Sequence, residues 1–205
     1  MEFNFKKCFG QNFLTDNNIT EGIASSIDYK KNNLVIEIGP GGGALTKRLL
    51  RKVDKAILYE IDERLNDVIK KELDGFDNYE LIFGDFLERD VKGDLCKYKY
   101  DNLYIVANLP YYITTPIISK IIDDEIDASE IVIMIQKEVA DRLSADVGTK
   151  EYGSISVFLN YFYDIKKLFN VSRNSFIEIL LKINIPKNDK KNIDYWRRFW
   201  YDVFS

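Results

Sequence analysis

The chain has 205 residues, of which 46% are hydrophobic, a composition typical of one globular domain large enough to enclose a core. Its formal net charge is −4 and it contains no histidine, which excludes a histidine general base and histidine metal ligands. We expect a cytoplasmic protein without a metal. No apolar run approaches the about 18 residues of a membrane span, no signal peptide is evident, and Cys8 and Cys96 lack metal-binding spacing.

Apolar strand-like runs alternate with helix-like runs along most of the chain. The predicted strands are 34–38, 55–60, 79–83, 103–107 and 131–135, and the predicted helices are 17–27, 44–52, 63–73 and 114–123. This alternation predicts a parallel sheet with helices on both faces. A further helix is predicted at 154–162, followed by two strands near 164–170 and 177–185.

A glycine-rich turn, Glu37 to Gly43, closes the strand 34–38 and opens the next helix. Glycines at such a turn let a ligand approach the backbone closely because no Cβ intervenes. The spacing G-x-G-x-G differs from the dinucleotide fingerprint G-x-G-x-x-G, and the Lys-Ser/Thr of a P-loop is missing. The context of strand, turn and helix predicts a nucleotide-like ligand, with a plain turn as the alternative.

Acidic residues follow the next two strands. Glu60 stands 21 residues after Gly39, near the ~20 expected for an acid that binds ribose hydroxyls. Asp85, in Gly84-Asp85-Phe86, could accept a hydrogen bond from an adenine amine. The alternative for each acid is a helix N-cap or a surface charge. Because ligands of open α/β sheets lie at the carboxyl ends of strands, we expect these acids to share one edge.

The segment Asn108-Leu109-Pro110-Tyr111 follows the strand 103–107 and precedes a helix-like run. The Asn108 side-chain oxygen and the Leu109 carbonyl can accept both N–H bonds of an adenine N6 amine. Tyr111 can stack on the ring. The alternative for the tetrapeptide alone is a strand that ends in a proline turn.

Together these motifs resemble the ribosomal RNA adenine dimethyltransferases, which are S-adenosylmethionine (SAM) enzymes with a Rossmann-like core. The resemblance covers about residues 5–176. Its matching segments are Gly10 to Leu14, Glu37 to Gly43, Glu60, Gly84-Asp85, Asn108 to Tyr112, Gln136 to Glu138, Gly148 to Gly153 and Asn170 to Phe176. Two of these, Gly39-Pro40-Gly41 and Asn108 to Tyr112, are more similar to the small-subunit (16S) branch than to the large-subunit (23S) branch of the macrolide-resistance type.

The resemblance implies an α/β Rossmann-like methyltransferase fold, with a mostly parallel seven-stranded sheet and an antiparallel edge hairpin. It implies SAM-dependent N6,N6-dimethylation of adenines in small-subunit ribosomal RNA, linked to ribosome assembly, by a monomer. The implied cofactor-binding residues are Gln11, Asn12, Leu14, Gly39, Gly41, Glu60, Ile61, Asp85, Phe86 and Asn108. The implied catalytic residues are Asn108, Leu109, Pro110 and Tyr111, with Tyr111 and Phe176 stacking on the target base. Glu37 is expected beneath the glycine loop, where it would satisfy backbone donors.

Methyl transfer from a sulfonium needs no histidine, because the leaving group is a neutral thioether. The protein must align amine, methyl carbon and sulfur. Acceptors at Asn108 and Leu109 would free the nitrogen lone pair and stabilise the positive charge that develops on nitrogen. The amine proton can then leave to water.

The sequence departs from the family after Phe176, which runs directly into Ile177 where family members carry a proline-rich loop. We expect a catalytic domain at 1–186 and the start of an incomplete C-terminal helical region at 187–205. The negative net charge argues against RNA binding. Basic clusters at Lys47 to Lys52 and Lys187 to Arg198 could still follow phosphates or could be solvated faces.

Three functions are alternatives to the dimethylation of small-subunit RNA. One is the same chemistry on large-subunit (23S) ribosomal RNA. Another is a non-catalytic module that binds RNA or a ribosome-assembly intermediate. An NAD-dependent dehydrogenase lacks its fingerprint here.

Overall fold

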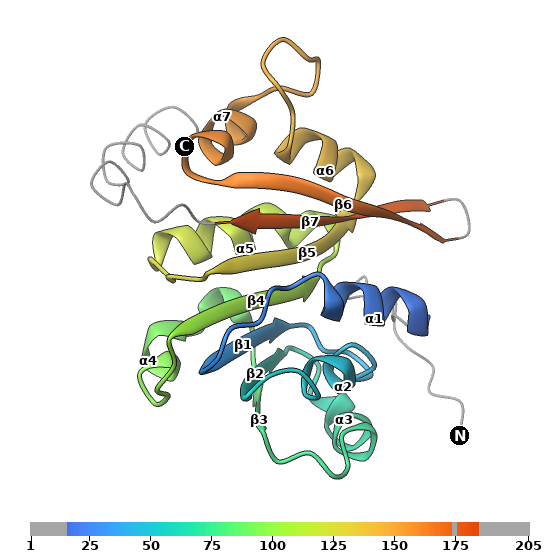
Figure 1. Ribbon diagram of the computed structural model, residues 1–205, viewed down its shortest axis with the longest axis vertical. Coiled ribbons are helices and arrows are strands. Elements are labelled where there is room, and N and C mark those ends of the chain that lie inside the picture. The colour runs from blue at the N-terminus through green and yellow to red at the C-terminus, as the bar shows by residue number, and fades with distance from the viewer. Residues whose placement is uncertain (1–15, 174–175, 185–205) are drawn as a thin grey trace.

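A seven-stranded sheet in the order β3-β2-β1-β4-β5-β7-β6 runs through the computed structural model, which describes residues 16–173 and 176–184 (Figure 1). β1 to β5 are parallel, whereas β7 is antiparallel to both β5 and β6. The strands are β1 (Asn33–Ile38), β2 (Lys55–Glu60), β3 (Tyr79–Phe83), β4 (Asn102–Asn108), β5 (Glu130–Gln136), β6 (Asp164–Arg173) and β7 (Phe176–Asn184). The expected α/β architecture with a mostly parallel sheet is confirmed.

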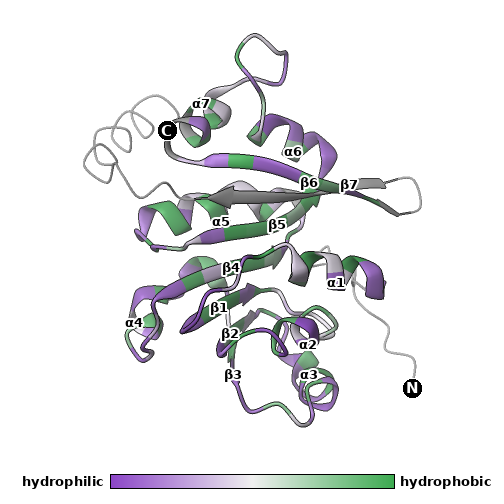
Figure 2. Cartoon of the chain, viewed as in Figure 1, coloured by the Kyte–Doolittle hydropathy of each residue, from purple (hydrophilic) through white to green (hydrophobic). Residues whose placement is uncertain are grey.

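Helices connect the parallel strands and cover both faces of the sheet. The α-helices are α1 (Asn17–Ser25), α2 (Thr46–Leu49), α3 (Asn66–Glu72), α4 (Val91–Leu95), α5 (Tyr111–Asp123), α6 (Lys137–Leu143) and α7 (Ser154–Phe162). Two short 3-10 helices are η2 (Glu63–Leu65) and η3 (Phe86–Glu88). In Figure 2, apolar residues gather on the central strands, and hydrophilic residues gather on the surrounding helices and loops.

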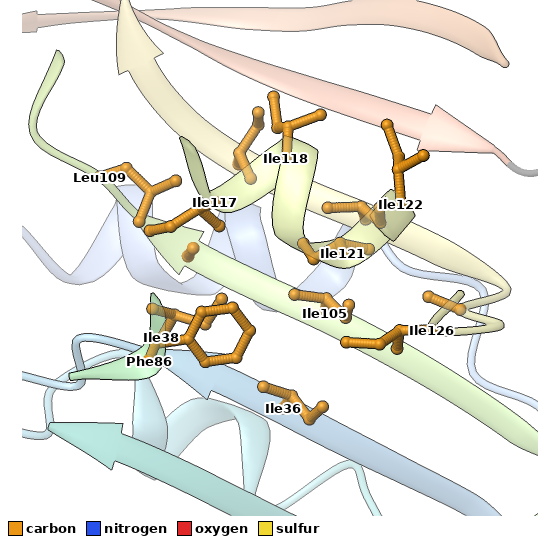
Figure 3. Packing of buried hydrophobic residues seen from close by; sticks show 14 of the residues in the cluster. Ile36, Ile38, Phe86, Ile105, Leu109, Ile117, Ile118, Ile121, Ile122 and Ile126 are labelled. Carbon is orange, nitrogen blue, oxygen red and sulfur yellow. The ribbon is translucent and has the colours of Figure 1, made fainter. Parts of the chain in front are cut away.

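The core consists of two apolar layers on opposite faces of the sheet. Ile36 and Ile105 point toward α4 and α5, where the isoleucines of α5 pack over them (Figure 3). Val35 and Leu58 point to the other face, against α1, α2 and α3. Every residue of β1 is buried, which is typical of a central parallel strand covered by helices on both sides. The continuous apolar run that predicted this strand reflects that burial.

The predicted helix at 44–52 is wrong in extent, because α2 spans only Thr46–Leu49. Gly43, directly before the predicted start, has a positive φ of 83°, so the helix begins late; beyond Leu49 the chain continues in turns, with Lys52 N bonded to the Leu49 carbonyl three residues earlier. Two helices, α4 and α6, were not predicted. They have only 5 and 7 residues, too few for the apolar period of 3.6 to become evident.

Replacing Ile105 with alanine should lower the free energy of unfolding by about 2–5 kcal/mol, because this fully buried side chain leaves a cavity between β4 and α5. Urea unfolding would measure the effect. The matched control is Val147→Ala in a loop, where the side chain is 81% exposed and the change should be under about 0.5 kcal/mol. Equal losses in the two variants would contradict the assignment of the core.

Candidate cofactor and acceptor site

The carboxyl ends of the parallel strands meet at one edge of the sheet. Ile38 at the end of β1 pairs with Ala107 of β4, so Gly39 and Asn108 follow at the same level on adjacent strands. The strand order reverses between β1 and β4, which makes this position the topological switch point where open α/β sheets bind ligands. The sequence-predicted glycine turn and the Asn108 segment are thus brought together.

Gly39 and Gly84 leave open space at this edge. Gly39 has φ +74° and Gly84 has φ +146°, conformations that side-chain-bearing residues rarely adopt. A Cβ placed on either residue would meet no atom of the described residues within 4 Å. The backbone here is therefore accessible to a ligand at close range.

Glu60, rather than Glu37, holds the glycine loop. The Glu60 side chain is buried, and its Oε2 accepts a hydrogen bond from Gly41 N at 3.0 Å while its Oε1 accepts one from Asp62 N at 3.0 Å. The expectation that Glu37 satisfies backbone donors of this loop is wrong. Glu37 pairs with Leu58, two positions before Glu60, and so lies deeper in the sheet than the loop.

Glu37 is a buried acid with an unsatisfied oxygen. Its side chain is 2% exposed, and neither its Oε2 nor the buried Thr46 Oγ1 makes a hydrogen bond within the described part of the chain. Burial raises the pKa of Glu37 to about 8, the neighbouring Thr46 hydroxyl opposes this rise, and the Glu60 carboxylate adds to it. Burial also raises the pKa of Glu60, although the hydrogen bonds from the backbone oppose that rise.

Asp85 lies at the end of β3 and caps the following turn. Its Oδ1 accepts a hydrogen bond from Leu87 N at 2.9 Å at the start of η3, so the N-cap role considered from the sequence is present. A carboxylate accepts several hydrogen bonds, and this exposed one can also face a ligand. Nearby, Ile61 is 47% exposed, whereas the Phe86 side chain is buried.

The Asn108 segment changes from strand to helix within three residues. Asn108 ends β4 and is half-buried, Leu109 N donates to the Met134 carbonyl at 3.1 Å, and Pro110 is the N-cap of α5. The hydroxyl of Thr114 donates to the Pro110 carbonyl at 3.2 Å. The segment is thus fixed between β5 and α5.

Some predicted site residues fall outside the described part of the chain. These are Gln11, Asn12 and Leu14, together with the side chains of Tyr111 and Phe176.

The basic residues of the α2 region are largely engaged with neighbours. Lys47 pairs with Glu72 at 3.0 Å and Lys52 with Glu21 at 2.9 Å. Arg48 donates to the Asn17 side chain at 2.9 Å. Exposed pairs of this kind contribute only about 0–1 kcal/mol each, so another anion could replace the partner at little cost.

Asp62 is a structural acid that the sequence analysis did not identify. It is buried, caps η2 by accepting from Arg64 N at 3.1 Å, and forms an ion pair with the Arg64 side chain, which lowers the pKa of Asp62. An acid just after a strand and before a helical turn is a known N-cap signal that could have identified it. Its backbone N–H, bonded to Glu60, helps to place that carboxylate.

This sheet order, with a glycine turn at the switch point and acids after β2 and β3, is the Rossmann-like methyltransferase fold. The chain belongs to the ribosomal RNA adenine dimethylase family, whose sequence model matches residues 2–205. The expected family is confirmed.

Individual relatives support this assignment. A "Ribosomal RNA small subunit methyltransferase A" of Lactococcus lactis is 46% identical over 178 residues, which is 86% of this chain and 60% of the relative. A crystal structure of a dimethyladenosine transferase from Plasmodium falciparum is 29% identical with TM-score 0.80, covering 92% of this chain and 69% of that one. The 23S rRNA methyltransferase ErmE has TM-score 0.76 at 21% identity, covering 91% of this chain and 76% of its own, and shares the fold. The chain therefore spans about three fifths of the length of the Lactococcus relative.

Neither a metal-binding group nor a membrane-spanning helix is present among the described residues. They contain no group of three or more histidine, cysteine, aspartate or glutamate side chains placed to hold a metal ion. None of the helices in this part of the chain combines the length and apolar character needed to cross a membrane.

The stability of the protein should depend on the protonation of Glu37. Because its pKa rises from about 4.5 to about 8 on folding, the folded protein keeps a proton that the unfolded chain releases. Stability from this group therefore falls as the pH rises through this range, by at most about 1.4 kcal/mol per pH unit, and levels off above it. Glu37→Gln removes the titrating group, so urea unfolding should show a flatter pH dependence than the wild type. Parallel pH profiles of wild type and variant would contradict this assignment.

Proposed function

We propose that this chain is a SAM-dependent enzyme that dimethylates N6 of adenines in small-subunit ribosomal RNA. One observation carries the proposal: Asn108 lies beside the glycine turn at the switch point of the sheet, in a member of the ribosomal RNA adenine dimethylase family. The 46% identity to a small-subunit methyltransferase favours that subunit as the source of the RNA.

The cofactor would lie along the carboxyl ends of β1, β2 and β3. Gly39 and Gly41 would face its methionine part, since the open space at Gly39 admits a ligand against the backbone. Glu60 would accept hydrogen bonds from the ribose hydroxyls with lone pairs that Gly41 N and Asp62 N leave unused.

The adenine end would lie between the turns that follow β2 and β3. Asp85 would accept from the adenine amine, and the exposed Ile61 would pack on the ring. Phe86 would contribute its main chain, because its side chain is buried. Gln11, Asn12 and Leu14 would complete the site.

The acceptor adenine would bind at Asn108, which would also border the cofactor. The Asn108 side-chain oxygen and the Leu109 carbonyl would accept the two N–H bonds of N6, and Pro110 would fix that carbonyl at the start of α5. Tyr111 and Phe176 would stack on the two faces of the base, which returns part of the few kcal/mol spent on flipping it.

The bound cofactor supplies a methyl group activated by its sulfonium. The residues at Asn108 hold the amine in line with that carbon and stabilise the charge that develops on nitrogen. The N6 proton leaves to water, so the absence of histidine from the sequence is compatible with the reaction.

The remaining features belong to the same proposal. The catalytic domain would span 1–186, with 187–205 beginning a helical region, and the protein would act as a cytoplasmic monomer on ribosomal RNA. Large-subunit RNA is the second candidate substrate, which the shared fold with ErmE permits without favouring. A non-catalytic RNA-binding module has no use for an amine-reading Asn108.

Asn108→Ala and Asp85→Ala should separate acceptor chemistry from cofactor binding. Asn108→Ala should lower kcat by at least about a hundredfold while SAM affinity changes little, because the main loss is a transition-state hydrogen bond. Asp85→Ala should weaken SAM binding about tenfold or more, because it removes a charged acceptor. Calorimetry with SAM and single-turnover methylation measure the two effects. Retained turnover in Asn108→Ala would remove this residue from the catalytic role.

The proposed function itself is tested by transfer from labelled SAM to unmethylated small ribosomal subunits, with large subunits as the comparison. We expect N6,N6-dimethyladenine in small-subunit RNA only. Label confined to the large subunit would favour the second candidate. Cofactor binding without transfer to either subunit would leave a binding module.

A further inference from the structure

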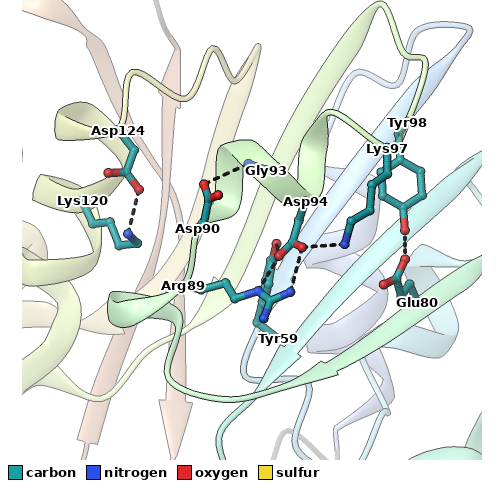
Figure 4. A network of polar contacts seen from close by, with 10 residues as sticks. All are labelled: Tyr59, Glu80, Arg89, Asp90, Gly93, Asp94, Lys97, Tyr98, Lys120 and Asp124. Atoms are coloured by element: carbon teal, nitrogen blue, oxygen red, sulfur yellow. Dashed lines mark hydrogen bonds and ion pairs between the residues drawn. The ribbon is translucent and has the colours of Figure 1, made fainter.

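Asp94 in α4 is a buried carboxylate whose hydrogen-bonding capacity is fully used. It is 3% exposed. Its Oδ2 accepts from the Tyr59 hydroxyl at 3.1 Å and from Arg89 Nε at 2.6 Å, and its Oδ1 accepts from Arg89 Nη2 at 2.8 Å and from Lys97 Nζ at 2.9 Å. The three partners converge on this one side chain (Figure 4). Four bonds match the about four lone-pair sites of a carboxylate.

Two of these partners connect Asp94 to the proposed cofactor edge. Tyr59 directly precedes Glu60 in β2, and its ring packs edge-on against Phe86, with centroids 5.3 Å apart and an interplanar angle of 70°. Phe86 directly follows Asp85. Asp94 is thus linked to Glu60 through its chain neighbour Tyr59, and to the Asp85 turn through the contact between the Tyr59 and Phe86 rings.

Arg89 provides the second connection. Its backbone N donates to the Phe86 carbonyl at 3.3 Å and closes the η3 turn, while its guanidinium binds Asp94 through two nitrogens. Such a bidentate pair fixes orientation as well as distance. Asp85 stands at the start of the η3 turn, and Arg89 at the end of that turn is therefore attached to Asp94.

The third hydrogen-bond partner of Asp94 is Lys97. Lys97 lies three residues after Asp94, just beyond the same helix, with a side chain that is 54% exposed. It helps to neutralise the buried charge, and among the described residues its ammonium group makes its hydrogen bond to Asp94 and none to Tyr59 or η3. The Arg89 guanidinium, with Lys97 and Tyr59, holds the pKa of Asp94 well below its usual range despite burial, so the group is ionised at neutral pH.

The pairing of β2 with β3 and the hydrogen bond from Gly84 N to the Glu60 carbonyl at 2.9 Å bring Glu60 and Asp85 side by side. We propose that Asp94 is a positioning residue for the adenosine end of the cofactor: through Tyr59 and Arg89 it holds these two acids at the spacing that the ligand requires. The inference rests on the proposed function, since it assumes that these two acids bind ribose and adenine. Asp94 itself touches neither ligand nor reacting atoms.

The test measures the affinity of Asp94→Asn for S-adenosylhomocysteine and for adenosine by calorimetry, well below the unfolding temperature. We expect both dissociation constants to rise about tenfold. We expect the KM for SAM to rise while kcat at saturating SAM and the KM for RNA stay at wild-type values. A residue that only stabilises the fold would lower the unfolding temperature without this split.

Lys97→Gln is the matched control, because it removes one partner of the same carboxylate and leaves Tyr59 and Arg89 in place. Its dissociation constants should stay within about twofold of wild type. Tyr59→Phe removes only the hydroxyl and should weaken the binding of both S-adenosylhomocysteine and adenosine. This variant tests the inference by itself if Asp94→Asn does not fold.

A double-mutant cycle of Asp94→Asn with Asp85→Ala adds a second readout. Because Asp94 acts partly through Asp85, the double variant should lose less affinity than the two single variants added together. Unchanged affinity in Asp94→Asn and Tyr59→Phe, or an equal loss in Lys97→Gln, would overturn the inference while leaving the proposed function intact. Failure of the wild type to bind S-adenosylhomocysteine would instead remove the proposed function, and the inference with it.

Discussion

The parallel pairing of β1 with β4 is the constraint on which the rest of the site depends. Its register sets Ile38 opposite Ala107 and therefore Gly39 beside Asn108. Both strands are buried on both faces, and their side chains point alternately to one face and the other. A slip of the pairing by one residue would therefore move Ile36 from the layer under α4 and α5 to the layer under α1, α2 and α3. The hydrophobic core that stabilises the fold thereby also fixes the distance between the glycine turn and Asn108.

The electrostatics of the glycine loop favour a cationic ligand. Glu37 and Glu60 lie on adjacent strands, both are buried, and burial raises the pKa of each. Among the described residues, no ion pair with a lysine or arginine reaches either carboxyl group. A positive charge brought by a ligand would favour their ionised forms. The positive charge of the proposed sulfonium cofactor would fit this requirement better than its neutral product.

The sequence predicted the parts of the structure that depend on neighbouring residues. The central strands were recognisable as continuous apolar runs, and the ends of β1 to β4 carry the glycines, acids and Asn108 from which a ligand site was predicted. The sequence could not show which acid bonds to the glycine loop, because that depends on the register that brings Glu60 level with Gly39, from where its side chain reaches Gly41 N. It also could not show the role of Asp94, whose partner Tyr59 lies 35 residues away. Contacts between distant segments become visible only when the sheet is assembled.

The acidic net charge separates two tasks that an RNA-modifying enzyme must combine. In the proposed function, reading a flipped adenine at Asn108 would be local and nearly neutral in free energy, because unstacking costs a few kcal/mol and stacking on an aromatic ring returns about 1–3 kcal/mol. Affinity for the rest of an RNA comes mainly from phosphate contacts, which require unpaired cations. Lys47 on α2 and Lys52 in the turn after it already have carboxylate partners. If RNA bound at this face, one anion would be exchanged for another and the binding would depend strongly on salt, whereas the geometry at Asn108 is fixed by β4, β5 and the start of α5.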